Sequence, residues 1–159
     1  MGGPLRWLTD PRWLRRLPRR WLPIGSRAVV VGGDLAAVEL AEFLAERGRR
    51  VTLLEAGLEL APEVGLKRRT EHMDRLDALG VAVHTGVCAE RIDEGGVWLA
   101  DGLSIPADSV ILAGEVEAET SLYDALKDRV PEVHAIGDCT GLGLIRKATE
   151  EGARAACAL

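Results

Sequence analysis

The most constraining feature of the sequence is a strand, helix and strand pattern that fills residues 27–55. Residues 27–31 read RAVVV, a short β-branched run typical of a strand buried on both faces of a parallel sheet. Residues 34–47 repeat apolar side chains at the period of a helix that packs one face on a sheet, and Gly48 follows as its C-cap. Residues 51–55, VTLLE, form a second buried strand. A crossover of this kind predicts two parallel strands with a right-handed connection.

Two glycines stand at the turn between the first strand and this helix, in the stretch VVVGGDLAAVE. A backbone that must approach a pyrophosphate closely needs glycine there, and the following helix directs its first N–H groups at the phosphates. Gly32 takes the tight-turn position, Asp34 the position of closest approach, and Ala37 the helix-packing position, where alanine is an accepted substitute. The candidate contacts with a dinucleotide are therefore Gly32, Gly33, Asp34, Leu35 and Ala37.

Glu55 ends the second strand, where a carboxylate can hold the two hydroxyls of an adenosine ribose. A site for the 2′-phosphate of NADP would instead want an arginine just beyond that carboxylate. Ala56 and Gly57 stand there. The sequence therefore favours NAD(H) over NADP(H) as the cofactor.

Asp34 leaves two alternatives open. A carboxylate beside a dianionic pyrophosphate repels it, because two charges about 4 Å apart at an effective dielectric constant of about 20 interact by roughly 4 kcal/mol. The same side chain can instead cap the helix, accepting backbone N–H bonds where a phosphate would otherwise lie. The residue types alone do not choose between cofactor binding and capping.

The rest of the chain continues the alternation of strands and helices and adds a small antiparallel part. The periodicity predicts a helix over residues 66–79 and a strand over residues 81–85. The later elements expected are a hairpin over residues 88–92 and 97–99, strands over residues 109–113 and 133–136, and a closing helix over residues 144–158. The predicted fold class is α/β, a Rossmann-like doubly wound domain with a mostly parallel sheet and a small antiparallel β insertion.

The first 26 residues differ from the rest in charge and composition. Six arginines against Asp10 give them a charge of +5, so the other residues carry −10 toward the net charge of −5. They also hold Trp7, Trp13 and Trp21. Arginine interleaved with tryptophan could form a nucleic-acid or membrane-surface patch, but a connector that packs on the acidic body is the simpler explanation. We therefore expect a basic segment over residues 1–26, a nucleotide-binding domain over residues 27–113 and a further segment over residues 114–159, with neither nucleic acid nor membrane as a partner.

Other chemistry-bearing residues do not assemble into a catalytic or metal site in the sequence. An odd number of cysteines at long spacings matches neither a redox pair nor a zinc ligand set, so we expect them to be buried as small hydrophobic residues: Cys88, Cys139 and Cys157. Three glutamates of the first helix are expected on a solvated face: Glu39, Glu42 and Glu46. No apolar run approaches the roughly 20 residues that span a bilayer, and a cytoplasmic protein is expected.

Two stretches resemble one family of oxidoreductases. They are residues 27–57 and the late segment VPEVHAIGDCTGLGLIRKATEEGARAA. Both resemble the C-terminal pyridine-nucleotide module of the NADH:flavin oxidoreductases that include 2,4-dienoyl-CoA reductase and trimethylamine dehydrogenase, a module similar to the broader pyridine nucleotide-disulfide oxidoreductase superfamily. The resemblance implies that Gly137 and Asp138 meet the ribityl or phosphate part of FAD, and that residues 114–159 correspond to the second half of an FAD-binding domain.

The resemblance also implies what a complete enzyme would add. In the family an FAD fingerprint precedes the nicotinamide module, and residues 1–26 contain none. The expected function is therefore the nicotinamide-dinucleotide-binding part of an NAD(P)H-dependent flavin oxidoreductase, with FAD and hydride transfer only in the complete enzyme. A flavin-bearing part or partner chain is expected, and a homo-oligomer is compatible with the sequence. The alternative is a degenerate nucleotide fold that binds no cofactor and acts in assembly, which Asp34 and Glu115 favour.

Overall fold

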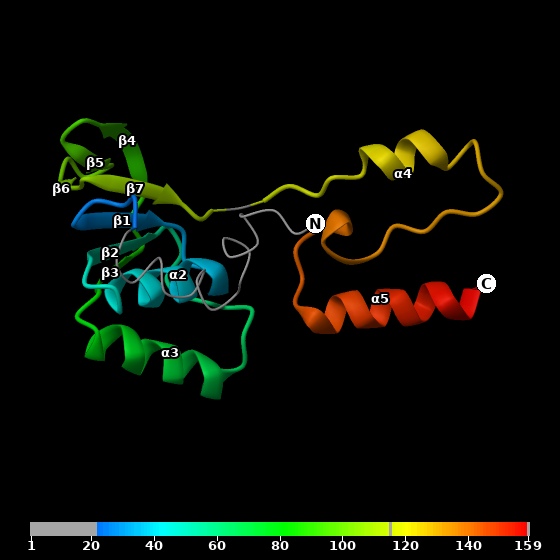
Figure 1. The fold of residues 1–159 in the computed structure, drawn as a ribbon, viewed down its shortest axis with the longest axis horizontal. Coiled ribbons are helices and arrows are strands. Elements are labelled where there is room, and N and C mark those ends of the chain that lie inside the picture. Colours follow the sequence, from blue (N-terminus) through cyan, green and yellow to red (C-terminus); the bar gives the residue numbers. More distant parts are fainter. Residues whose placement is uncertain (1–21, 115, 159) are drawn as a thin grey trace, which may run out of the picture. The chain divides into compact units, whose positions relative to one another are not determined.

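The structure is a computed structural model that describes residues 22–114 and 116–158. The chain divides into two units at Gly114, and the first unit contains both sheets (Figure 1). The expectations for the tryptophans and arginines of residues 1–21 lie outside the described residues.

A four-stranded parallel sheet forms the centre of the first unit, in the order β3-β2-β1-β7. Its strands are β1 (Arg27–Val31), β2 (Arg50–Glu55), β3 (Ala82–Thr85) and β7 (Ser109–Leu112). In the pairing register Val30 of β1 lies opposite Leu53 of β2 and Ile111 of β7. The parallel pairing predicted for the first two strands is confirmed.

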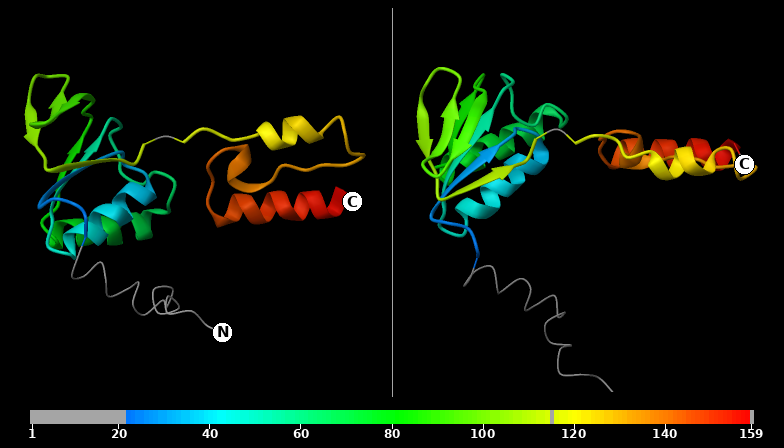
Figure 2. Two further views of the ribbon diagram at one scale, coloured as in Figure 1. Left: turned by 45° about the horizontal axis from the view of Figure 1, so that its top comes forward. Right: turned by 90° about the horizontal axis from the view of Figure 1, so that it is seen from above.

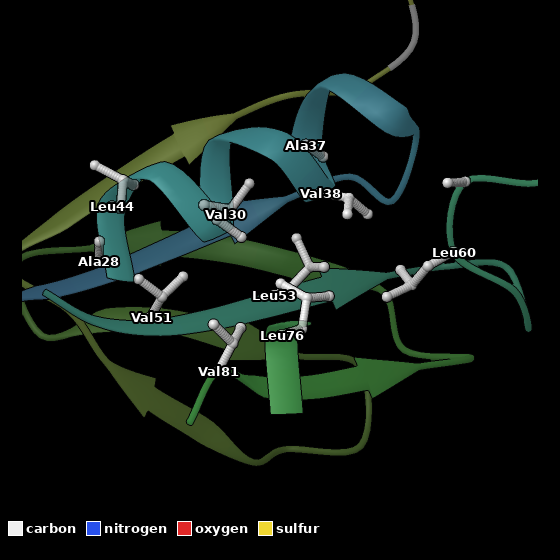
Figure 3. Packing of buried hydrophobic residues seen from close by; sticks show 12 residues of the cluster. Ala28, Val30, Ala37, Val38, Leu44, Val51, Leu53, Leu60, Leu76 and Val81 are labelled. Carbon is white, nitrogen blue, oxygen red and sulfur yellow. The ribbon is translucent and has the colours of Figure 1, made fainter. Parts of the chain in front are cut away.

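Two helices, α2 (Leu35–Ala45) and α3 (Leu66–Ala78), lie on one side of this sheet (Figure 1). Figure 3 shows the apolar side chains that fill the space between them and the sheet. Val30, Leu44 and Leu53 are fully buried there. Burial of a side chain of this size stabilises the fold by about 1.5–3 kcal/mol. Ala37 and Val38, near the start of α2, are buried in the same core, so the core also fixes the amino-terminal end of α2 against the sheet.

A three-stranded antiparallel sheet lies on the other side of the parallel sheet (Figure 2). Its strands are β4 (Ala89–Asp93), β5 (Gly96–Leu99) and β6 (Ser104–Pro106). Val97 and Leu99 of β5 pack against Val29 and Leu54 of the parallel sheet. The predicted hairpin is confirmed, whereas β6 has three residues and ends in proline, a pattern too short to predict. The Rossmann-like α/β fold with a small antiparallel insertion is confirmed.

The second unit contains α4 (Ser121–Leu126), the 3₁₀ helix η2 (Gly137–Thr140) and α5 (Ile145–Ala158). The closing helix is confirmed, and α4 lies between residues 113 and 133, where no element was predicted. The strand predicted over residues 133–136 is wrong. A strand needs a neighbour to pair its backbone groups, and residues 116–158 contain no strand that could do so. None of the described residues of this unit is buried.

Glu42 was expected on a solvated helix face, and this prediction is wrong. The residue is 6% exposed. Its Oε1 lies 2.6 Å from Nδ1 of His72, and its Oε2 lies 3.4 Å from Nε of Arg75. α3 packs across α2 and supplies both partners, which makes burial of the carboxylate tolerable. The pattern of α2 alone could not show a partner that lies thirty residues away.

The prediction that the cysteines are buried is also wrong. Cys88 and Cys157 are exposed, and Cys139 is half-buried. Cys88 comes just before the outer strand β4, and Cys157 lies in the last turn of α5, so neither position faces a core. In the described part of the chain no three His, Cys, Asp or Glu side chains gather as a metal site. Nor does any helix there combine the length and apolar character that a membrane crossing requires.

Candidate functional site

The turn between β1 and α2 lies at the carboxyl ends of the central strands and admits only glycine at its first position. Gly32 has φ +128°, a conformation that L side chains rarely adopt. A Cβ added there would lie 1.8 Å from the carbonyl oxygen of Ala113, just beyond β7. The Gly32 N–H donates to the carbonyl of Leu54 at 2.8 Å. The turn is therefore held tightly between the ends of β2 and β7.

Asp34 is the N-cap of α2. Its backbone is extended, and its Oδ1 accepts a hydrogen bond from the Ala37 N–H at 2.8 Å. A carboxylate in this position satisfies one of the helix amides that have no partner within the helix and lies at the positive end of the helix dipole. The capping geometry considered from the sequence is present in the structure.

A second carboxylate lies on the same turn and was missed by the sequence analysis. Oε1 of Glu63 accepts a hydrogen bond from the Leu35 N–H, the first amide of α2. The loop that carries Glu63 is fastened to the turn, because the Ala61 N–H donates to the Gly33 carbonyl at 2.6 Å and Ala61 is fully buried. No local pattern marks Glu63, since its partner lies 28 residues away.

Glu55 ends β2 and lies beside the same turn. A Cβ added at Gly33 would lie 2.6 Å from Cγ of Glu55, so glycine leaves the room that this side chain fills. The Glu55 Oε1 accepts a hydrogen bond from the Gly57 N–H at 2.5 Å. The structure thus brings Glu55 together with the predicted residues of the glycine turn, at the carboxyl ends of the central strands β1 and β2.

These residues fit an anionic dinucleotide in two respects and oppose it in one. The glycine turn leads directly into the amino terminus of α2, and Glu55 is a hydrogen-bond acceptor beside it. The amides of Leu35 and Ala37 are demonstrably able to hold carboxylate oxygens. However, both oxygens come from this chain, so a phosphate must compete with them.

Gly137 and Asp138, the residues expected at a flavin, form η2 in the second unit. Gly137 has φ +79°, and its N–H donates to Oε2 of Glu151 at 2.7 Å. This backbone hydrogen bond, with those from Thr140 and the charge of Lys147, lowers the pKa of Glu151. Asp138 itself is exposed. Glu151 therefore fixes the Gly137 turn from α5, and Oδ1 of the exposed Asp138 accepts a hydrogen bond from the Gly143 N–H at 3.4 Å.

A parallel sheet with a glycine turn, a capped helix and a carboxylate at the end of the second strand defines the class of Rossmann-like dinucleotide-binding modules. Residues 8–152 match the pyridine nucleotide-disulphide oxidoreductase family. The chain belongs to this family, which confirms the resemblance seen in the sequence.

Individual relatives agree with this assignment. A bilirubin reductase from Mediterraneibacter gnavus is 38% identical over 141 residues, which cover 85% of this chain and 22% of the relative. An NADH oxidase from Thermoanaerobacter brockii is 32% identical over 132 residues, 80% of this chain and 20% of the relative. The structure of a 2-naphthoyl-CoA reductase in complex with 2-naphthoyl-CoA matches with a TM-score of 0.79 at 29% identity, over 87% of this chain and 22% of that one. The chain spans about a fifth of the length of these relatives.

Proposed function

We propose that the first unit binds NAD(H) for a flavin oxidoreductase and that hydride passes to FAD only when the flavin-bearing part is present. The observation that carries this proposal is the turn between β1 and α2, where two amides at the start of the helix hold carboxylate oxygens and Glu55 lies beside Gly33. Anion binding at a helix amino terminus is the means by which this fold holds a pyrophosphate.

The residues of this chain would bind and orient the cofactor. The amides of α2 would hold the pyrophosphate, and Glu55 would accept hydrogen bonds from the adenosine ribose hydroxyls after giving up its contact with the Gly57 amide. Bound NADH supplies the hydride, and the flavin accepts it. A 2′-phosphate would meet the Glu55 carboxylate without an arginine next to it, because Ala56 and Gly57 follow. We therefore propose NAD(H) in preference to NADP(H).

The second unit is proposed to be the later half of an FAD-binding domain, with Asp138 directed at the flavin. Its described residues bury no side chain, and seven large hydrophobic residues are exposed: Val116, Leu122, Val130, Ile136, Leu142, Leu144 and Ile145. A segment of this size without a core is not expected to be stable alone. We propose that the flavin-bearing part, in the same polypeptide or a partner chain, covers this surface.

Calorimetric titration with NADH and NADPH tests the nucleotide site. We expect saturable binding of NADH that is at least tenfold tighter than that of NADPH, and weaker binding after Glu55→Ala. Glu90→Ala, which changes an exposed glutamate of β4, is the matched control and should leave the affinity unchanged. Absence of NADH binding by the wild type and by variants that remove carboxylates from the turn would refute the proposal.

An absorption spectrum tests the flavin half. We expect the purified chain to lack the absorption band near 450 nm, an approximate property of oxidised flavin, and to show no NADH oxidase activity until flavoprotein is added. A flavin band in the isolated chain would contradict the proposed division of the FAD site.

The second candidate is a nucleotide fold that binds no cofactor and serves in assembly. The observation in its favour is that Asp34 and Glu63 already bond two amides of the α2 amino terminus. It predicts that removing either carboxylate lowers stability without creating nucleotide affinity.

A further inference from the structure

We propose that Glu63 is a displaceable internal ligand of the glycine turn, whose carboxylate must leave the Leu35 amide before a pyrophosphate can bind. This inference rests on the proposed dinucleotide site and identifies a residue that sets its affinity. When no nucleotide is present, the Glu63 carboxylate would occupy the Leu35 amide in place of a phosphate.

The first argument is the position of the carboxylate. Glu63 accepts from the Leu35 N–H, the amide that begins α2 directly after the glycine turn. A pyrophosphate in a Rossmann-like site draws on the same helix amino terminus. Two anions on one N–H donor would lie within a few ångströms of each other and repel strongly. Binding of one therefore requires departure of the other.

The second argument is that Glu63 can leave while its loop stays in place. Leu60 and Ala61 are buried, and the Ala61 N–H bonds the Gly33 carbonyl at 2.6 Å. Glu63 itself is exposed. Rotation of its side chain would move the carboxylate fully into water, and the cost would be the lost hydrogen bond to the Leu35 N–H. The anchored backbone would keep it ready to return.

The third argument is the contrast with Asp34. Its carboxylate bonds an amide only three residues ahead and belongs to the helix cap itself, so it cannot move far without ending the cap. Glu63 reaches the helix from another loop, 28 residues along the chain. Of the two carboxylates on the turn, Glu63 is therefore the one suited to exchange with a ligand.

The proposal predicts opposite effects on the empty chain and on nucleotide binding. Glu63→Ala should lower the melting temperature of the empty chain, because the Leu35 amide loses its acceptor. The same change should tighten NADH binding at least tenfold, which corresponds to about 1.4 kcal/mol. Glu63→Gln should also tighten binding, by less than the alanine variant, because a neutral acceptor bonds the amide more weakly than a carboxylate.

The experiment combines calorimetry with amide NMR on the whole chain. NADH is titrated into wild type, Glu63→Ala and Glu63→Gln, with Glu90→Gln as a control of equal charge change. The Leu35 amide resonance is followed in each empty protein and during the titration. We expect Glu63→Ala to shift this resonance and speed its hydrogen exchange in the empty chain, and we expect the control to do neither.

The outcomes separate this inference from the proposed function. Equal NADH affinity of wild type and Glu63→Ala would overturn the role of Glu63 and leave the nucleotide site standing. A Leu35 amide that is unchanged in the empty Glu63→Ala variant would also overturn it. Absence of binding by every variant, with the Leu35 amide shifted as expected, would overturn the nucleotide site and with it the competition. Tighter binding together with a lower melting temperature would support both.

Discussion

Replacing Asp34 by glycine should improve NADH binding and cost little stability. Asp34 caps α2 through a 2.8 Å hydrogen bond from the Ala37 N–H. Glycine at an N-cap costs only a few tenths of a kcal/mol relative to aspartate. The charge matters more for binding. A carboxylate about 4 Å from a phosphate repels it by roughly 4 kcal/mol at an effective dielectric constant of about 20.

The expected gain in binding free energy is smaller than this repulsion of roughly 4 kcal/mol, since Asp34 is half-buried and water screens part of its charge. A third of this repulsion, about 1.4 kcal/mol, already corresponds to a tenfold tighter dissociation constant. We therefore expect Asp34→Gly to bind NADH at least tenfold more tightly than the wild type. Glu55→Ala on this background should reverse much of the gain by removing the ribose acceptor.

Calorimetric titration measures the affinities, and urea unfolding measures the stability of the same samples. Asp34→Asn is the matched control, because asparagine caps a helix as well as aspartate but carries no charge. If repulsion is the cause, Asp34→Asn should gain affinity without losing stability. A gain for glycine alone would refute the electrostatic argument, and no binding by any of the variants would favour the second candidate function.

Three further predictions concern the fold that holds the site. Gly32→Ala should lower the free energy of unfolding by at least about 2 kcal/mol in urea titrations, because its Cβ would lie 1.8 Å from the Ala113 carbonyl oxygen and φ is +128°. Glu42→Ala should lower it by about 1–3 kcal/mol, since His72 would lose its buried partner; an unchanged midpoint would contradict this. The pKa of Asp108 is lowered, chiefly by side-chain hydrogen bonds from the arginine that begins β1. This stabilisation is present above the unfolded-state value of about 4 and lost as pH falls, so Asp108→Asn should show a shallower loss of stability between about pH 5 and pH 2.

The local elements of the first unit could be predicted because their signals are local. The β-branched run of β1, the apolar period of α2 and the glycines between them depend on neighbouring residues alone. The same stretch also predicted a carboxylate at the end of β2, and the structure brings Glu55 beside Gly33. In the second unit, the closing helix was predicted from a comparable spacing of apolar residues. The strand predicted over residues 133–136 is absent, because strand formation depends on a distant partner.

The sequence by itself determined a Rossmann-like module with a glycine turn and a carboxylate at the end of its second strand, since helix and strand periods and turn chemistry depend on adjacent residues. Only the tertiary structure decided what surrounds that turn. It placed the Ala113 carbonyl against Gly32, paired buried Glu42 with His72, and laid Glu63 on the Leu35 amide. Each of these contacts joins residues about 30 or more positions apart, and their geometry is fixed by how the sheet orders its strands and how the helices and loops pack beside it.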